Sequence, residues 1–189
     1  MTDRQAAAAA IDVFLRAIGR DPEKQADLQG TGQRVADAYI DELCVGYAKD
    51  PKKILNDAAM NGATYLVIAR ALPVATTCPH HLMQSWGDAT VVFAPSEKIV
   101  GLGAIAQALD ACSQRLILQE TIGEDLVAAI FDALKPRWAA CRLSLAHGCL
   151  TARGERAHHA RVETIAVRGE VDRSHAEKVL FGASEDAPL

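Results

Sequence analysis

The sequence predicts an α+β fold in which an antiparallel sheet carries helices on one face and is preceded by N-terminal helices. The expected elements follow the order helices, two strands, two helices and two strands, so no β-α-β alternation indicates a parallel sheet. The chain has 189 residues, of which 50% are hydrophobic, enough for one domain with a full core or for one domain with an appendage. We therefore expect an N-terminal helical segment over residues 1–60 and a sheet domain over residues 61–189.

The spacing of apolar residues predicts the helices. Over about residues 2–19, Ala6, Ala10 and Val13 recur at the period of one helix face. Residues 32–47 carry a second apolar stripe of the same kind, which favours core or subunit packing. The period returns later in the chain over residues 103–116 and 123–134.

Short apolar runs predict the strands. Residues 65–69 and 89–94 are rich in β-branched and aromatic residues. Between them lies Pro79, which cannot donate a hydrogen bond to a sheet ladder, so we expect its surroundings at a strand end or a bulge. The small, acidic tail after Ser184 is expected to be loose. The two later strands are expected over residues 139–146 and 161–167.

The composition limits the classes of function. The formal net charge is −4 and there is no basic stripe, which argues against a nucleic-acid partner because phosphate binding needs clustered cations. Neither a long apolar run nor a secretory leader is present, so we expect no membrane partner and a cytoplasmic location. Five cysteines, an odd number, favour free thiols and metal ligands over disulfides. Three of them lie in apolar stretches and are expected to be buried structural thiols: Cys44, Cys112 and Cys141.

Two short patches supply ligands for a metal ion. Residues 78–81 read Cys-Pro-His-His, and residues 147–149 read His-Gly-Cys. A catalytic zinc ion usually has three protein ligands and an open fourth position, and two cysteines with one histidine are a known set. The candidate ligands are Cys78, His81 and Cys149. His80 and His147 would then be free to move protons, although a Cys/His pair with a distant cysteine can also form a closed structural site.

Several motifs occur together in the order found in the GTP cyclohydrolase I family. Residues 78–82 correspond to a family Cys-Glu-His-His-Leu stretch, and residues 101–104 to a Gly-Leu-Ser-Lys turn. Residues 119–120 match a Gln-Glu pair. Residues 146–154 correspond to a family Ala-x-His-x-Cys-Met-x-x-Arg-Gly stretch from its histidine onward, with Leu150 at the methionine position. From about residue 28 to residue 169, the sequence therefore resembles that family.

The resemblance implies a tunnelling fold, in which the sheets of several subunits join into a barrel. It implies a homo-oligomer, commonly two face-to-face rings of five, with Zn²⁺ at active sites between subunits and a purine-like substrate. In that reaction water adds at C8 of the purine, which becomes electrophilic when a histidine protonates a ring nitrogen. The implied zinc ligands are Cys78, His81 and Cys149, the implied proton-transfer pair is His80 and His147, and the implied substrate contacts are Gln119, Glu120 and Arg153.

The sequence departs from the family where the triphosphate would be held. Gly103 and Ala104 replace the family Ser-Lys pair, and Gln107 replaces a family arginine. Arg153 and Arg115 remain. A triphosphate is normally held by several Lys, Arg or backbone donors, so the sequence predicts hydrolysis of the imidazole ring of a guanine-like purine without that tail.

Two other functions stay open at this level. The protein could be a true GTP cyclohydrolase I that makes 7,8-dihydroneopterin triphosphate and formate, with other cations such as Lys98 compensating. It could also be a non-catalytic, metal-binding regulatory protein with a closed site. His158 and His159 could be substrate contacts or solvated histidines on an edge strand. Trp86 could stack on a base or pack in an interface.

Overall fold

The computed structural model describes residues 2–62, 65–153 and 156–182. By its internal contacts the chain forms two compact units, Met1–Val45 and Gly46–Leu189. The boundary near residue 60 that the sequence indicates stays a prediction. In the described part of the chain, no helix is both long enough and apolar enough to cross a membrane.

The first unit is a helical hairpin. Helix α1 (Arg4–Ala17) begins at Asp3, whose carboxylate accepts a hydrogen bond from the backbone N–H of Ala6. It packs on α2 (Thr31–Ala38) at Gly32, where an added Cβ would lie 2.4 Å from the carbonyl oxygen of Ala8. A glycine is therefore needed for this close approach.

The second predicted helix is interrupted. After α2 the chain widens into a π-helical turn, η2 (Tyr39–Leu43), in which the N–H of Cys44 donates to the carbonyl of Tyr39 at 2.9 Å. A 3₁₀ turn, η3 (Val45–Ala48), follows. The apolar stripe over residues 32–47 thus belongs to three short elements, because apolar periodicity does not report the change of helix type. A further short 3₁₀ turn, η1 (Ala26–Leu28), joins α1 to α2.

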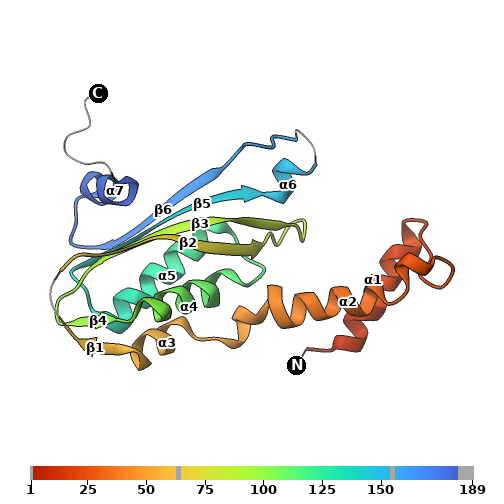
Figure 1. The fold of residues 1–189 in the computed structure, drawn as a ribbon, viewed down its shortest axis with the longest axis horizontal. Coiled ribbons are helices and arrows are strands. Elements are labelled where there is room, and N and C mark those ends of the chain that lie inside the picture. The colour runs from red at the N-terminus through yellow and green to blue at the C-terminus, as the bar shows by residue number, and fades with distance from the viewer. Residues whose placement is uncertain (1, 63–64, 154–155, 183–189) are drawn as a thin grey trace. The chain divides into compact units, whose positions relative to one another are not determined.

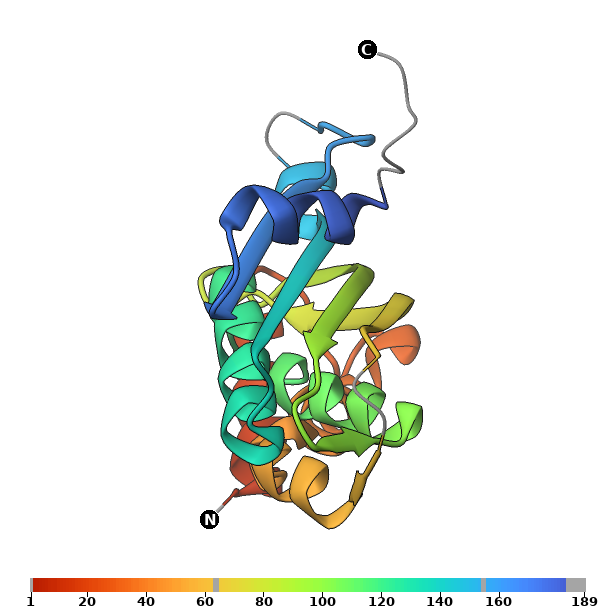
Figure 2. The ribbon, with the colours of Figure 1, turned by 90° about the vertical axis from the view of Figure 1, so that its left-hand side faces the viewer.

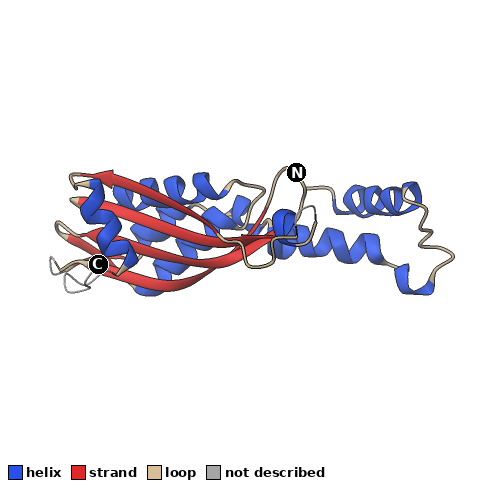
Figure 3. Ribbon diagram, turned by 90° about the horizontal axis from the view of Figure 1, so that it is seen from above, coloured by secondary structure: helices blue, strands red, loops and turns tan. Residues whose placement is uncertain are grey.

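The second unit is built on a four-stranded antiparallel sheet in the order β2-β3-β5-β6 (Figure 1). Figure 3 shows the four strands running side by side. The predicted runs at residues 65–69 and 89–94 cover only part of the first two strands. The first strand continues to residue 77, and the second begins at residue 84. The strands are β2 (Val67–Thr77), β3 (Gln84–Ala94), β5 (Trp138–His147) and β6 (Val162–Gly169).

One face of the sheet is covered by α4 (Leu102–Ser113) and α5 (Gln119–Leu134) (Figure 1). The helix α7 (Arg173–Phe181), which the sequence did not predict, contacts β3, β5 and β6 on the opposite face (Figure 2). The confirmed fold class is α+β, an antiparallel sheet with its main helices on one face, preceded by N-terminal helices. The predicted loose tail after Ser184 lies outside the described residues.

The two cores follow the alternation of side chains along a strand. Val91 and Phe93 point into the large core beneath α4 and α5, while Val92 and Ala94 point into a smaller core with Leu180 of α7. All five side chains are fully or almost fully buried, and burying a side chain the size of valine or leucine stabilises a fold by about 1.5–3 kcal/mol. The sheet is therefore held from both faces, and the strand ends near Cys78 and His147 carry the two metal-ligand patches.

Short elements complete the second unit. Helix α3 (Pro51–Asp57) has Asp50 as its N-cap and proline in its first turn, and the sequence analysis did not predict it. The strands β1 (Ala59–Asn61) and β4 (Lys98–Val100) form a separate antiparallel pair. A single helical turn, α6 (Gly148–Thr151), follows β5 directly.

Candidate active site

The first metal-ligand patch lies in the turn between β2 and β3. The N–H of Cys78 donates to the carbonyl of Met83, and the N–H of Leu82 donates to the carbonyl of Cys78, each at 2.9 Å. Leu82 has φ of 53°, in the left-handed region that few residues other than glycine adopt. Pro79 is thus placed at a strand end, as predicted, where its missing N–H costs no ladder hydrogen bond.

The second patch is brought beside the first by strand pairing. Ser85 on β3 is the register partner of His147 on β5. Gly148 follows, and an added Cβ there would lie 2.6 Å from the carbonyl oxygen of Gln84, so the chain passes too closely for a larger residue. This approach places Cys149, at the start of α6, next to the β2–β3 turn.

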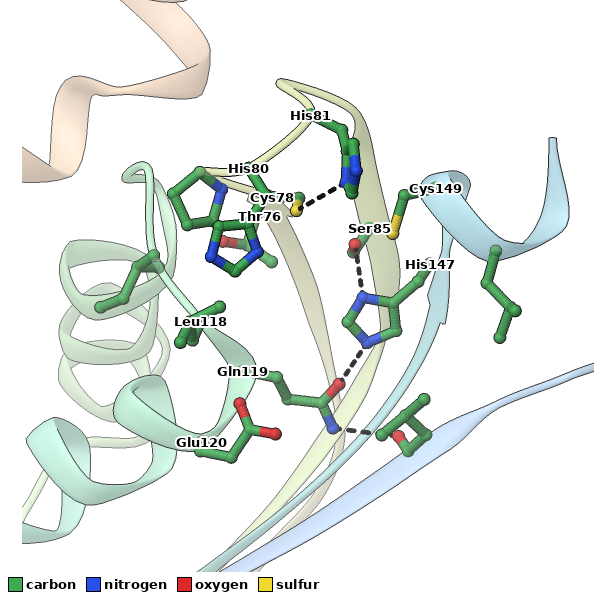
Figure 4. A pocket seen from close by; sticks show the side chains of 14 residues that line it. Thr76, Cys78, His80, His81, Ser85, Leu118, Gln119, Glu120, His147 and Cys149 are labelled. Atoms are coloured by element: carbon green, nitrogen blue, oxygen red, sulfur yellow. Dashed lines mark hydrogen bonds between the residues drawn. The ribbon is translucent and has the colours of Figure 1, made fainter. Parts of the chain in front are cut away.

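The three predicted metal ligands form one cluster. One ligand atom each from Cys78, His81 and Cys149 lie within 4.8 Å of one another, and Cys78 Sγ is 3.8 Å from His81 Nδ1 (Figure 4). The two cysteines are half-buried and the histidine is exposed. Two sulfurs and one imidazole nitrogen are a donor set suited to a soft or borderline divalent ion, so this group could hold a metal ion.

The surroundings of Cys149 favour its protonated thiol. Burial raises the pKa of the Cys149 thiol, and the neighbouring Cys78 sulfur raises it further, against a smaller lowering by Arg153. A bound cation reverses this effect, because metal ligation favours the thiolate. Cys112 and Cys141 differ: both are buried in the core and burial raises the pKa of each to about 12, as expected of inert structural thiols. Cys44 is only half-buried.

His147 is held at both ring nitrogens. Its Nε2 lies 2.7 Å from Oε1 of Gln119, and its Nδ1 lies 3.0 Å from Oγ of Ser85 (Figure 4). Burial lowers the pKa of His147, while the negative charge of Glu120 raises it. Sequence reasoning missed Ser85, because a serine in a strand carries no signal until the register of β3 and β5 is known.

Gln119 is buried, with 3% of its surface exposed, at the first residue of α5. The sequence placed the start of this helix at Gly123, because the apolar period becomes clear only there. The amide nitrogen of Gln119 donates to the carbonyl of Val162 at 2.9 Å and to that of Leu143 at 3.2 Å. Its side chain therefore ties α5 to β5, β6 and His147, and its predicted contact with substrate stays a prediction.

Glu120 and His80 face the same pocket and are exposed (Figure 4). Within the described part of the chain, the Glu120 carboxylate has no hydrogen bond or ion pair, so its oxygens can accept bonds from a ligand. The ring of His80 contacts the edge of the His81 ring, with 6.2 Å between centroids. It has no hydrogen bond to any other described residue.

The metal pocket, as we call it, has a volume of about 320 Å³. This is the size of a small-molecule site, with apolar walls and a few polar groups. Its walls combine the metal-ligand cluster, both remaining histidines and Glu120 with apolar side chains. The apolar and hydroxyl-bearing lining residues are Thr76, Pro79, Ser85, Ile117, Leu118, Leu150 and Val162.

The remaining predicted site residues lie elsewhere. Arg153 is exposed just after α6, close enough to influence Cys149. Arg115 does not line the metal pocket; it donates to the carbonyl of Lys49 and lies over the ring of Tyr47. Three other candidates line a separate hollow with Arg161: Trp86, His158 and His159.

The region that departs from the family pattern forms another hollow, the Gly103 pocket. It is lined by Gly101, Gly103, Ala104 and Gln107 together with Asp57 and its neighbours. Among its described lining residues there is an acidic side chain and no lysine or arginine. It thus offers no cation to a phosphate.

A family model for GTP cyclohydrolase I matches residues 7–184. The chain belongs to the GTP cyclohydrolase I family. Members of this family are hydrolases that act on carbon–nitrogen bonds of a cyclic amidine. The metal-ligand cluster thus belongs to a member of an enzyme family, as predicted.

Curated relatives span almost the whole chain. GTP cyclohydrolase 1 of Streptococcus pyogenes serotype M49 is 32% identical over 177 residues, covering 93% of this chain and 90% of its own length. The enzyme of Brucella anthropi is 34% identical over 177 residues, covering 93% and 82%, and that of Leifsonia xyli subsp. xyli is 35% identical over 170 residues, covering 89% and 88%. A solved structure of the archaeosine synthase QueF-Like in the apo form is 18% identical, with a TM-score of 0.47, covering 59% of this chain and all of that one.

Proposed function

We propose that this protein is a zinc-dependent cyclohydrolase that opens the imidazole ring of a guanine-like purine without a triphosphate tail. The observation that carries the proposal is the contrast between two pockets. The metal pocket combines a Cys-His-Cys cluster with a free carboxylate and two histidines, whereas the Gly103 pocket offers no cation among its described residues.

The chain's own residues would bind and orient the base. Glu120 would accept hydrogen bonds from the ring N–H and the exocyclic amine of guanine, and a base without these donors would leave the carboxylate unpaired. Ile117, Leu118 and Leu150 offer apolar surface to the faces of the base. Gln119 and Arg153 would be further contacts for the substrate.

Proton transfer is assigned to His80 and His147. His80 is exposed and its ring nitrogens bond no other described residue, so it can approach a ring nitrogen of the substrate directly. Cys78, His81 and Cys149 would hold the zinc ion. When bound, that ion supplies Lewis acidity and lowers the pKa of a coordinated water.

A substrate panel tests the proposal. Zinc-loaded protein is incubated with guanine, guanosine, GMP and GTP. Ring opening is followed by the loss of purine absorbance, and a second hydrolysis of the resulting formamide is followed by the release of formate. We expect guanosine or guanine to give a higher kcat/KM than GTP. Faster turnover of GTP than of every phosphate-free compound would overturn it.

A true GTP cyclohydrolase I is the second candidate, because the three curated relatives reported above carry the name GTP cyclohydrolase 1. It would convert GTP into 7,8-dihydroneopterin triphosphate and formate. A fluorescent pterin formed from GTP, after oxidation of the product, would favour this candidate. Membership of a hydrolase family favours either enzyme over the non-catalytic metal-binding protein.

The proposal includes a cytoplasmic homo-oligomer with no nucleic-acid partner, and a decamer with active sites between subunits is the expected assembly. Light scattering on the zinc-loaded protein gives its mass directly. A monomer would exclude sites shared between subunits.

A further inference from the structure

The orientation of the Gln119 amide is fixed by its surroundings. Its nitrogen lies 2.9 Å from the carbonyl oxygen of Val162, 3.2 Å from that of Leu143 and 3.1 Å from the hydroxyl of Thr164. Carbonyl oxygens only accept hydrogen bonds, so a flipped amide would set its own oxygen against two acceptors. The amide oxygen must therefore be the atom that faces His147.

This orientation determines which nitrogen of His147 carries a hydrogen. An amide oxygen only accepts, and Nε2 of His147 lies 2.7 Å from it, so Nε2 must donate. In the neutral ring, Nδ1 is then an acceptor. The only described group bonded to it is the hydroxyl of Ser85, 3.0 Å away.

Burial limits the hydrogen bonds that the Ser85 hydroxyl can make. It is 1% exposed, and the bond to His147 is the only one its side chain makes among the described residues. A buried hydroxyl almost always has a partner, so its proton is expected to point at Nδ1. Ser85 and His147 are also register partners on β3 and β5, so the sheet fixes the distance between them.

We propose that Ser85 is a positioning residue for His147. With Gln119 it holds the imidazole as the Nε2–H tautomer in one ring orientation, at the wall of the metal pocket beside Cys149. The inference rests on the proposed function, since it assigns a supporting group to a histidine of that site. It adds a difference between the histidines: His80 can move toward a ligand directly, whereas His147 is held at both nitrogens and would release one of these hydrogen bonds to exchange a proton.

The test compares two buried serines. Ser85→Ala removes the hydroxyl, Ser85→Thr keeps it, and Ser113→Ala is the matched control. Ser113 is 0% exposed in α4, and its hydroxyl has no hydrogen-bond partner among the described residues. We expect Ser85→Ala to lower kcat about tenfold with KM within about twofold, because a loosened group misplaces the reacting atoms. Ser85→Thr should restore most of the rate, and Ser113→Ala should behave as the wild type.

A measurement independent of turnover completes the test. In protein labelled with ¹⁵N-histidine, solid-state NMR reports which ring nitrogen carries hydrogen, and a His147→Asn variant identifies the signals of His147. We expect a protonated Nε2 and a hydrogen-bonded, unprotonated Nδ1 in the wild type, and a shifted Nδ1 signal in Ser85→Ala.

The proposal is overturned if wild-type His147 carries its hydrogen on Nδ1, or if Ser85→Ala changes neither the Nδ1 signal nor kcat. The NMR result on the wild type holds even if a variant does not fold. If no purine in the panel is turned over, the proposed function fails while the NMR arm still decides the role of Ser85.

Discussion

The metal pocket and the Gly103 pocket differ in how fully their side chains are engaged. Around the metal pocket, two strands, a tight turn and the start of α5 converge, and His147 is bonded on both sides. At Gly103 an added Cβ would meet nothing within 4 Å, so glycine is not required there by packing. The comparison shows that the pocket with the metal-ligand cluster is held by several hydrogen bonds, while the pocket formed by the residues that replace the family Ser-Lys pair is open and carries no cation in its described lining.

The largest effect is expected from removing a metal ligand. Cys149→Ser should abolish stoichiometric zinc binding and lower turnover by about a thousandfold or more, because the ion supplies the Lewis acid. Cys44→Ser is the control, since Cys44 is half-buried outside the cluster. Zinc content and the loss of purine absorbance are measured together. Full zinc content in Cys149→Ser would show that this cysteine is not a zinc ligand.

The next effect tests the base anchor. Glu120→Gln should lower kcat/KM for the best purine by about 100-fold, because a charged acceptor of two hydrogen bonds is replaced by a neutral amide. Glu124→Gln, four residues further along the same helix and outside the metal pocket, should leave the rate unchanged. Equal effects of the two changes would argue against recognition by Glu120.

A gain of function would test the role of the Gly103 pocket. The double change Gly103→Ser and Ala104→Lys adds a hydroxyl and a cation to the Gly103 pocket, where the glycine position has free space. We expect kcat/KM for GTP to rise about tenfold relative to guanosine, since charge-assisted hydrogen bonds to phosphate are strong. A control with Ala104→Gln should not change the ratio. An unchanged ratio for the lysine variant would show that this pocket does not face the substrate tail.

The smallest effect on activity is expected on the opposite face of the sheet. Leu180 of α7 is fully buried against β3 and β5, so Leu180→Ala should lower the free energy of unfolding by about 2–4 kcal/mol. Lys178→Ala on the same helix is exposed and should change it by less than about 0.5 kcal/mol. Urea unfolding measures both. Because the metal pocket lies on the other face, the rate of correctly folded Leu180→Ala should match the wild type.

The sequence predicted the site residues that belong to a recognisable motif. Cys78, His81 and Cys149 carry distinctive ligand chemistry, and the structure brings them within reach of one ion. Ser85 was not predicted, because its role follows only from the pairing of β3 with β5. The engagement of Gln119 with carbonyls of β5 and β6 is likewise a tertiary property that no local pattern reports.

The fold was predictable to a similar extent. The order of elements gave the antiparallel α+β class, which the sheet confirms. Helix α7 was missed because its segment reads as polar, and only Ala176 and Leu180 are buried there. Residues 70–77 of β2 and 84–88 of β3 were also missed, since Pro73 and Gly87 interrupt the apolar pattern that identifies a strand.

A crystal structure of the zinc-loaded protein with guanosine, recorded at the zinc absorption edge, tests the central claim most directly. We predict one anomalous peak among Cys78, His81 and Cys149, with the edge of the base at Glu120. The absence of that peak, or an ion closed off from the pocket by a fourth protein ligand, would contradict the account.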